Sequence, residues 1–264
     1  MDMIDINFIQ KIVIIGTGKL AWHLGSALKS AGFEIVQVVG RTAEKSGKLA
    51  QELGAQFVVS IDSVNLYADL YVLCVSDDII HEVIKTMPVV NGICVHVSGS
   101  KGIDVFGEKY KNFGIFYPLQ TFSEGRKLNF IDIPILIEAN SEVNNKKLIM
   151  FAENVSNNVF EVNSEERIKL HLAAVFVSNF VNALLSVGNE LISETNLPFR
   201  ILYSLVLETV NKAFDSNPDH SQTGPALRGD HGTMDAHLQM LQNKPELAAL
   251  YSLFSNYITQ KFSQ

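Results

Sequence analysis

The first half of the chain alternates short apolar runs with stretches of helical spacing, and this pattern restricts the possible folds more than any other feature. The runs KIVII, EIVQVV, LYVLCV, GICVHV and GIFYPL are rich in β-branched and aromatic residues, which is typical of buried strands. The segments between them have helical spacing, and the first of these helices is expected to end at Gly32. Alternating strands and helices build a parallel sheet covered on both faces, so we expect a doubly wound α/β domain.

The pattern changes near residue 160. From Asn163 onward the sequence is typical of one long helix, which Asn163 and Glu166 can begin as a capping box. Further helices are predicted near 198–214, 233–242 and 245–262, and no strand pattern occurs in this half. We therefore expect a Rossmann-type α/β domain over residues 1–158 and an all-helical domain over residues 159–264.

Composition narrows the class of protein. The 264 residues are 47% hydrophobic, and 21 Lys and Arg against 28 Asp and Glu give a net charge of −7, which argues against nucleic-acid binding through a broadly basic surface. The N-terminal residues lack the pattern of a signal peptide. The apolar stretch 172–187 is interrupted by polar residues, so we expect a buried helix and no membrane span. Cys74 and Cys94 lie in predicted strands and are expected to be reduced core thiols of a cytoplasmic protein without a metal site.

A glycine-rich loop follows the first predicted strand and precedes the first helix. Its sequence, GTGKLA, matches the G-x-G-x-x-G/A fingerprint of dinucleotide-binding turns. Gly16 permits the tight turn, Gly18 lets the backbone approach a pyrophosphate, and Ala21 allows close packing of helix on strand. The expected cofactor contacts of this loop are Gly16, Thr17, Gly18, Lys19 and Leu20. The alternative is a glycine turn that serves packing alone.

The end of the second predicted strand indicates which dinucleotide is bound. NAD-binding turns carry Asp or Glu here, whereas this chain has Gly40, Arg41 and Thr42. The Arg41 guanidinium can pair with a 2′-phosphate, and Thr42 can add a hydroxyl. We predict NADP(H) over NAD(H); the alternative is that Arg41 only lies at a solvated edge.

Two further strand ends carry polar residues, and ligands of open parallel sheets bind at this edge. Val75, Ser76 and Asp77 are expected beside the adenosine and ribose, unless Asp77 caps the following helix. Ser98 and Gly99 are expected near the nicotinamide.

The long helix carries an uncharged polar stripe. At 100° per residue, His171, Ser178, Asn182 and Asn189 fall within a narrow arc, with Asn179 beside it. The stripe is either the wall of a cleft or a buried hydrogen-bonding seam. In a cleft, His171 is the candidate general acid or base, and Asn179 can orient a substrate oxygen. The alternative for His171 is a core-edge histidine bonded to a backbone carbonyl.

Near the C-terminus the segment TGPALRGDHGT breaks the helical pattern. Arg228 can bind a substrate carboxylate or phosphate, and Asp230 can orient a histidine or cap the next helix. Because nothing in the sequence marks a secreted protein, the tripeptide Arg228-Gly229-Asp230 is not interpreted as an adhesion motif.

Five segments, in order, carry a resemblance: GTGKLAWHLGSAL, HVSGS, YPLQTF, HLAAVFVSNFVNAL and TGPALRGDHGTMDAHL. They resemble a bacterial family of Rossmann-like proteins related to deazaflavin-coenzyme:NADP oxidoreductases and pyrroline-5-carboxylate reductases. The resemblance spans nearly the whole chain, and the last two segments are its most specific part. It implies an NADP-binding domain, a helical domain of unknown function, and a homodimer formed through the helices.

The resemblance also bears on single residues. It implies that His171 and the segment around Arg228 face the nicotinamide. Ser98 stands where related β-hydroxyacid dehydrogenases bind substrate with a Ser-Gly pair, and His171 and Asn179 stand in for their Lys and Asn. The family often has His before PLQTF, where this chain has Tyr117. Tyr117 is therefore the alternative proton donor to His171.

These residues predict an NADP(H)-dependent oxidoreductase that acts on a small carbonyl, imine or hydroxy compound in an interdomain cleft. The expected catalytic and substrate-binding residues are Ser98, His171, Asn179, Arg228 and Asp230. The alternative is a non-catalytic NADP(H)-binding regulatory or sensor protein. A third possibility is a redox enzyme that uses a deazaflavin in place of an organic substrate.

Overall fold

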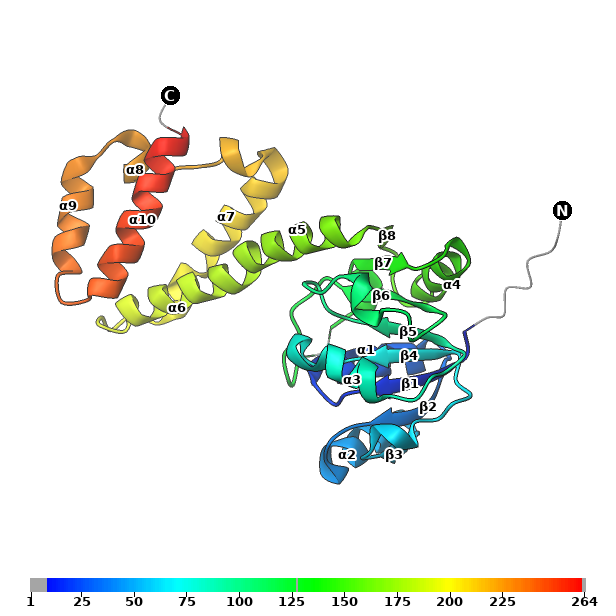
Figure 1. The fold of residues 1–264 in the computed structure, drawn as a ribbon. Coiled ribbons are helices and arrows are strands. Elements are labelled where there is room, and N and C mark those ends of the chain that lie inside the picture. The colour runs from blue at the N-terminus through cyan, green and yellow to red at the C-terminus, as the bar shows by residue number, and fades with distance from the viewer. Residues whose placement is uncertain (1–8, 127, 263–264) are drawn as a thin grey trace. The chain divides into compact units, whose positions relative to one another are not determined.

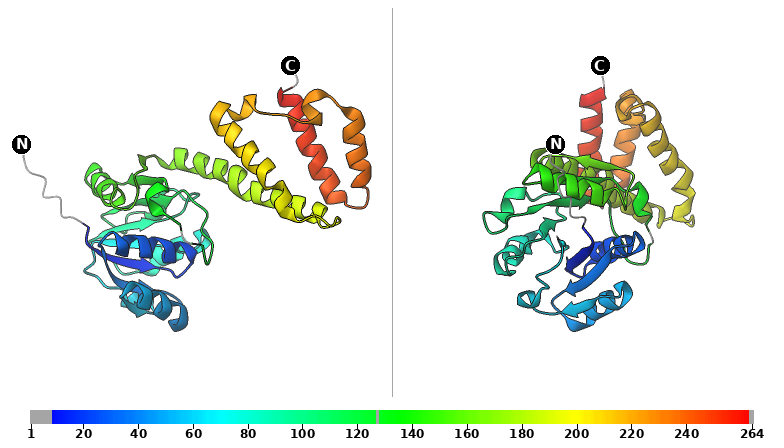
Figure 2. Two further views of the ribbon diagram at one scale, coloured as in Figure 1. Left: turned by 180° about the vertical axis from the view of Figure 1, so that it is seen from behind. Right: turned by 90° about the vertical axis from the view of Figure 1, so that its right-hand side faces the viewer.

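The computed structural model describes residues 9–126 and 128–262 and divides into two compact units, Met1–Ser178 and Asn179–Gln264. Figure 1 labels the elements, and Figure 2 shows the same ribbon from two other sides. The division falls within the long helix, later in the chain than the domain boundary predicted at residues 158–159, and that boundary stays a prediction. Most of the N-terminal segment that lacks the pattern of a signal peptide, residues 1–8, lies outside the described residues.

The first unit is built on one eight-stranded sheet in the order β3-β2-β1-β4-β5-β6-β7-β8. All neighbouring strands are parallel except β6 and β7, which are antiparallel. This confirms the predicted Rossmann-type sheet. The strands are β1 (Lys11–Ile15), β2 (Glu34–Val39), β3 (Gln56–Val58), β4 (Leu70–Leu73), β5 (Ile93–His96), β6 (Phe113–Pro118), β7 (Ile135–Ala139) and β8 (Val159–Glu161).

Helices cover both faces of this sheet, as the unbroken apolar strands require. Side chains of β1 alternate between two separate core clusters: Ile12 and Ile14 join the first, and Val13 and Ile15 join the second. The first cluster also contains Leu24 of α1, and the second contains Ile80 and Ile84 of α3. The helices of this unit are α1 (Lys19–Ser30), α2 (Ala43–Leu53), α3 (Ile80–Thr86), α4 (Glu142–Ala152) and α5 (Ser164–Ala174).

Both cysteines are free and buried, as predicted. Burial raises the pKa of Cys74 to about 12, so its thiol stays protonated and unreactive at neutral pH.

A single long helix leaves the sheet and continues into the second unit. The predicted capping box is present, because the Asn163 side chain accepts from the Glu166 N–H and the Glu166 side chain accepts from the Asn163 N–H. A π-helical segment, Val175–Phe180, separates α5 from α6 (Val181–Ile192). The remaining helices are α7 (Tyr203–Ser216), α8 (Pro225–Arg228), α9 (His231–Met240) and α10 (Pro245–Phe262), and they confirm the helical second half.

The expectation that the long helix is buried is wrong for this chain by itself. Along Ser164–Ile192 the only buried residue is Arg167, and apolar side chains such as Leu172 and Val177 are 59% and 72% exposed. By length and composition this helix could cross a membrane, with a mean hydropathy of 1.7 in its most apolar window. Among the described residues of the second unit, only Ala226 and Leu241 are buried hydrophobic residues. The second unit thus lacks a core of its own.

Candidate functional site

The glycine loop between β1 and α1 has the form that the fingerprint predicts. Gly16 has a φ of +114°, and a Cβ at this position would lie 2.1 Å from the Cys74 carbonyl oxygen, so only glycine fits. Gly18 is the N-cap of α1, and a Cβ there would meet nothing within 4 Å. Ala21 is fully buried against the sheet. The first N–H groups of α1 therefore border open space, which suits an anionic group.

A side chain at the first residue of the turn after β2 would have to displace two neighbouring side chains. A Cβ on Gly40 would lie 2.4 Å from the Ser46 hydroxyl oxygen and 2.7 Å from a methyl carbon of Thr17. Arg41 and Thr42 follow and are exposed. Thr42 occupies the N-cap of α2 without a side-chain capping hydrogen bond, so its hydroxyl does not serve the helix.

The turn after β4 holds Val75, Ser76 and Asp77. Val75 lies beside the glycine loop, because a Cβ on Gly16 would come 3.2 Å from its side chain. Asp77 accepts a hydrogen bond from the Ser100 hydroxyl and therefore ties the turn after β4 to the loop after β5. No side chain caps the helical turn Asp77–Ile79 or the helix α3 that follows it. The alternative role of Asp77 as a helix cap is therefore not observed.

The loop after β5 is organised around a histidine that the sequence analysis did not single out. His96 is fully buried; its Nδ1 accepts from the Ser98 N–H at 3.2 Å, and its Nε2 lies 3.3 Å from the Gly102 carbonyl oxygen. Burial lowers the pKa of His96 to about 4, so the imidazole stays neutral and Nε2 donates to Gly102. One side chain thereby holds both ends of the loop. A histidine inside an otherwise apolar strand was the sequence signal for this role.

Ser98 lies inside that loop and is 4% exposed. Its hydroxyl oxygen accepts from the N–H groups of Ser100 and Lys101, both at 3.1 Å. Ser98 therefore shapes the loop, and its predicted contact with a substrate stays a prediction.

Three residues from three elements meet at the end of β5 and β6. The Tyr117 hydroxyl of β6 lies 3.0 Å from Nδ1 of His171 on α5, and the ring centroids are 6.0 Å apart. Gly99 lies against both rings, because a Cβ there would come 2.5 Å from His171 Nδ1 and 2.8 Å from Tyr117 Cζ. Burial, with the Asp77 charge nearby, raises the pKa of Tyr117. Tyr117 thus keeps its proton at and above neutral pH, next to an imidazole.

The remaining predicted site residues belong to the second unit. Asn179 lies in the π-helical segment, and Arg228 is exposed at the end of α8. Asp230 is the N-cap of α9, where its carboxylate accepts from the Thr233 N–H at 3.1 Å and the Thr233 hydroxyl at 2.7 Å. These two bonds lower the pKa of Asp230. The capping role proposed for Asp230 is confirmed, and the roles of all three residues in a shared site stay predictions.

Two glycines of the loop after β1 are expected to respond differently to alanine. Gly16→Ala should lower the free energy of unfolding by about 1–3 kcal/mol, since it forces a positive φ and a clash. Gly18→Ala should change that free energy by less than about 1 kcal/mol, yet weaken dinucleotide binding by filling the open space. Chemical denaturation and NADPH titration followed by Trp22 fluorescence measure both effects. Unchanged affinity in Gly18→Ala would remove the loop from the binding site.

Two family models match the chain. Residues 11–95 match NADP oxidoreductases, coenzyme F420-dependent, and residues 133–258 match a domain of unknown function, DUF2520. No curated protein matches the sequence.

Several solved structures share the whole fold. A crystal structure of a candidate NADP oxidoreductase, BF3122 from Bacteroides fragilis, is 38% identical, with a TM-score of 0.88 over 97% of this chain and 100% of that one. An imine reductase from Myxococcus stipitatus, solved with NADP+, is 15% identical, with a TM-score of 0.66 over 96% and 100% of the chains. A 1-pyrroline-5-carboxylate reductase from Streptococcus pyogenes is 17% identical, with a TM-score of 0.62 over 96% and 98%. The last two show a shared fold alone.

The match to the Bacteroides fragilis protein extends over almost the full length of both chains, and the two family models agree with it in order and position. The chain therefore belongs to the family of NADP oxidoreductase-type proteins in which a coenzyme F420-dependent NADP oxidoreductase domain precedes a DUF2520 domain.

Proposed function

We propose that the protein is an NADP(H)-dependent oxidoreductase acting on a small carbonyl, imine or hydroxy compound. The observation that carries this proposal is the Tyr117–His171 pair, packed on Gly99 at the carboxyl ends of β5 and β6. The glycine loop follows β1, which is parallel to β4 and, through it, to β5 and β6. A dinucleotide bound at this edge would run from the glycine loop toward the pair.

The residues at this edge fit NADP(H). The space above Gly18 and the first turn of α1 would hold the pyrophosphate, and Arg41 with Thr42 would bind the 2′-phosphate. Gly40 supplies no carboxylate of the kind that selects NAD(H). Val75, Ser76 and Asp77 border the next part of the edge. When bound, the reduced nicotinamide supplies the hydride for the reaction.

Reduction of a carbonyl or imine needs a proton at the oxygen or nitrogen as the hydride reaches the carbon. The Tyr117–His171 pair supplies that proton in our proposal. When Nδ1 of His171 carries a hydrogen, it donates to the Tyr117 oxygen and leaves the Tyr117 O–H for the substrate. Tyr117 then gives its proton to the substrate and takes the Nδ1 proton of His171, while Nε2 of His171 accepts a proton from solvent, so the imidazole ends neutral. Because the pKa of Tyr117 is raised, its hydroxyl stays protonated at neutral pH before the substrate reacts.

Ser98, Asn179 and Arg228 remain the candidates for substrate binding in this proposal. Arg228 would bind a carboxylate or phosphate of the substrate, and Asn179 would orient its oxygen. Ser98 would hold the loop that faces the substrate.

We further propose that the protein is a cytoplasmic homodimer whose second copy covers the apolar helices. The exposed apolar side chains of the second unit include Leu205 at 64% and Ile201 at 55%, and this unit has almost no buried core among its described residues. Burial of apolar surface stabilises an assembly by roughly 25 cal/mol per Å². A second copy presents the same apolar surface, so each would cover the other.

Cofactor choice is expected to depend on Arg41. Arg41→Ala should weaken NADPH binding on the order of tenfold or more and leave NADH binding nearly unchanged, because a hydrogen bond to a charged group contributes about 1.5–3 kcal/mol. Trp22 fluorescence titration with each cofactor measures this. Lys45→Ala removes another exposed cation of the same turn region and serves as the control. Equal losses for both cofactors in Arg41→Ala would overturn the assignment.

Catalysis is expected to depend on the Tyr117–His171 pair. Tyr117→Phe and His171→Gln should each lower turnover by about 10²–10⁴-fold and leave NADPH affinity unchanged. Because the pKa of Tyr117 is raised, turnover of the wild type should decline only above about pH 10, where an ordinary tyrosine loses its proton. A screen of carbonyl and imine substrates with NADPH supplies the assay. The exposed residues Tyr67 and His81 provide matched controls as Tyr67→Phe and His81→Gln.

Full turnover in both pair variants would remove the pair from the mechanism. NADPH binding without turnover of any substrate by the wild type would instead favour the sensor alternative, and a spectral change of an added deazaflavin with NADPH would favour the deazaflavin alternative.

Association is expected to depend on the apolar surface of α7. Leu205→Asp should convert the dimer to monomers or lower its stability, since it places a charge in the proposed interface. Light scattering after size-exclusion chromatography gives the oligomeric state. Val59→Asp changes an apolar residue of similar exposure, 53%, in the first unit and should leave the dimer intact. A monomeric wild type would contradict the proposal.

A further inference from the structure

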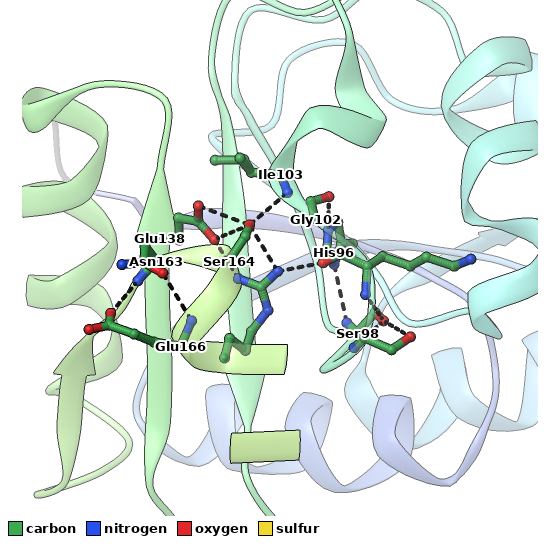
Figure 3. A network of polar contacts seen from close by, with 11 residues as sticks. His96, Ser98, Gly102, Ile103, Glu138, Asn163, Ser164 and Glu166 are labelled. Atoms are coloured by element: carbon green, nitrogen blue, oxygen red, sulfur yellow. Dashed lines mark hydrogen bonds and ion pairs between the residues drawn. The ribbon is translucent and has the colours of Figure 1, made fainter. Parts of the chain in front are cut away.

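The most deeply buried charge among the described residues is Arg167, which has 0% exposure in the first turns of α5. Its Nη1 forms an ion pair with Glu138 near the end of β7. The Ser164 hydroxyl lies 2.8 Å from one oxygen of the same carboxylate and 3.0 Å from the other. Figure 3 shows Glu138 and Ser164 side by side at the centre of this polar cluster.

The same cluster reaches the loop after β5. Nη2 of Arg167 donates to the Lys101 carbonyl oxygen, and the Ser164 hydroxyl accepts from the Ile103 N–H at 3.1 Å. The two terminal nitrogens of one guanidinium therefore bind two different elements, β7 and the loop after β5. Figure 3 shows His96 next to this connection, where it holds the loop together from within.

Each member of the Tyr117–His171–Gly99 group is attached to these elements. His171 lies four residues after Arg167, one turn further on the same helix. Gly99 lies in the loop whose Lys101 carbonyl binds Arg167. Tyr117 of β6 pairs with Leu136 of β7, the strand that carries Glu138. The position of one ring relative to the other therefore depends on the bonds that Arg167, together with Ser164, makes from α5 to β7 and to the segment after β5.

We infer that Arg167 is a positioning residue for the site, and this inference rests on the proposed function. Arg167 holds the first turns of α5 against β7 and the loop after β5, and so sets where His171 lies relative to Tyr117 and Gly99. Its role is geometric more than stabilising, because replacing a buried ion pair by uncharged groups often leaves stability unchanged. A lysine has one nitrogen, so it cannot bind Glu138 and the Lys101 carbonyl with the forked geometry of arginine.

The full-length protein and three variants test this role. Arg167→Lys keeps the charge and loses the fork, whereas Arg167→Met combined with Glu138→Gln removes both charges together. Lys169→Met combined with Glu165→Gln makes the same kind of change in an exposed ion pair of the same helix and serves as the control. The readouts are the nuclear Overhauser effect between the Tyr117 and His171 rings, the free energy of unfolding, the NADPH dissociation constant and turnover.

We expect Arg167→Lys to lose the ring-to-ring signal and to lower turnover on the order of 10²-fold, with the NADPH dissociation constant within about twofold of wild type. In the uncharged double variant, the free energy of unfolding should be close to that of the wild type. The ring-to-ring signal and turnover should stay low, because no group replaces the bond to the Lys101 carbonyl. The control should match the wild type in every readout. If Arg167→Lys does not fold, the double variant alone decides the question.

Retention of the ring-to-ring signal in Arg167→Lys, or its recovery together with stability in the double variant, would overturn the positioning role. The proposed function fails separately, if the wild type turns over no substrate. In that case loss of the ring-to-ring signal still establishes the geometric role of Arg167.

Discussion

The parallel pairing of β1 with β4, and of β4 with β5, is the constraint on which the candidate site depends. Because parallel strands end at the same edge of a sheet, the turns that follow them emerge together. The glycine loop, the turn that carries Asp77 and the loop that carries Gly99 come from distant parts of the sequence and share that edge for this reason. Gly16 shows how close the elements are, since its turn leaves no space for a Cβ beside the Cys74 carbonyl.

The loop after β5 is held by polar groups in addition to apolar packing. His96 is neutral and binds the loop from inside, while Arg167 binds it from α5. Buried polar groups are costly unless their hydrogen bonds are made, so such a cluster tolerates few alternative arrangements. The glycine at position 99 in turn lets two aromatic rings approach the backbone. A rigid loop would suit the proton donor that we propose for this site, because such a group must be held in one position.

Much of the first unit could be predicted from the sequence because buried strands and amphipathic helices leave a strong periodic pattern. The capping box at Asn163 and the glycine loop could also be predicted, since each depends on a few residues at fixed spacing. The role of Arg167 could not, because its partners Lys101 and Glu138 lie far away in the chain. His96 binds residues close to it in the chain, and its position inside an apolar strand was the signal that was missed. The long helix was predicted to be buried because its residues are apolar. An apolar pattern does not tell whether the surface that packs against such a helix belongs to the same chain. The roles of Asn179 and Arg228 could be predicted only as hypotheses for the same reason.

The π-helical segment Val175–Phe180 has a consequence for the polar stripe of the long helix. A regular α-helix turns by roughly 100° per residue, and a π-helical turn takes in more residues. Asn182 and Asn189 on α6 are therefore rotated about the helix axis away from the line that regular spacing from His171 would give. The length of this segment therefore determines which side chains of α6 lie on the same face of the helix as His171. The anchoring of α5 to the sheet does not change that rotation.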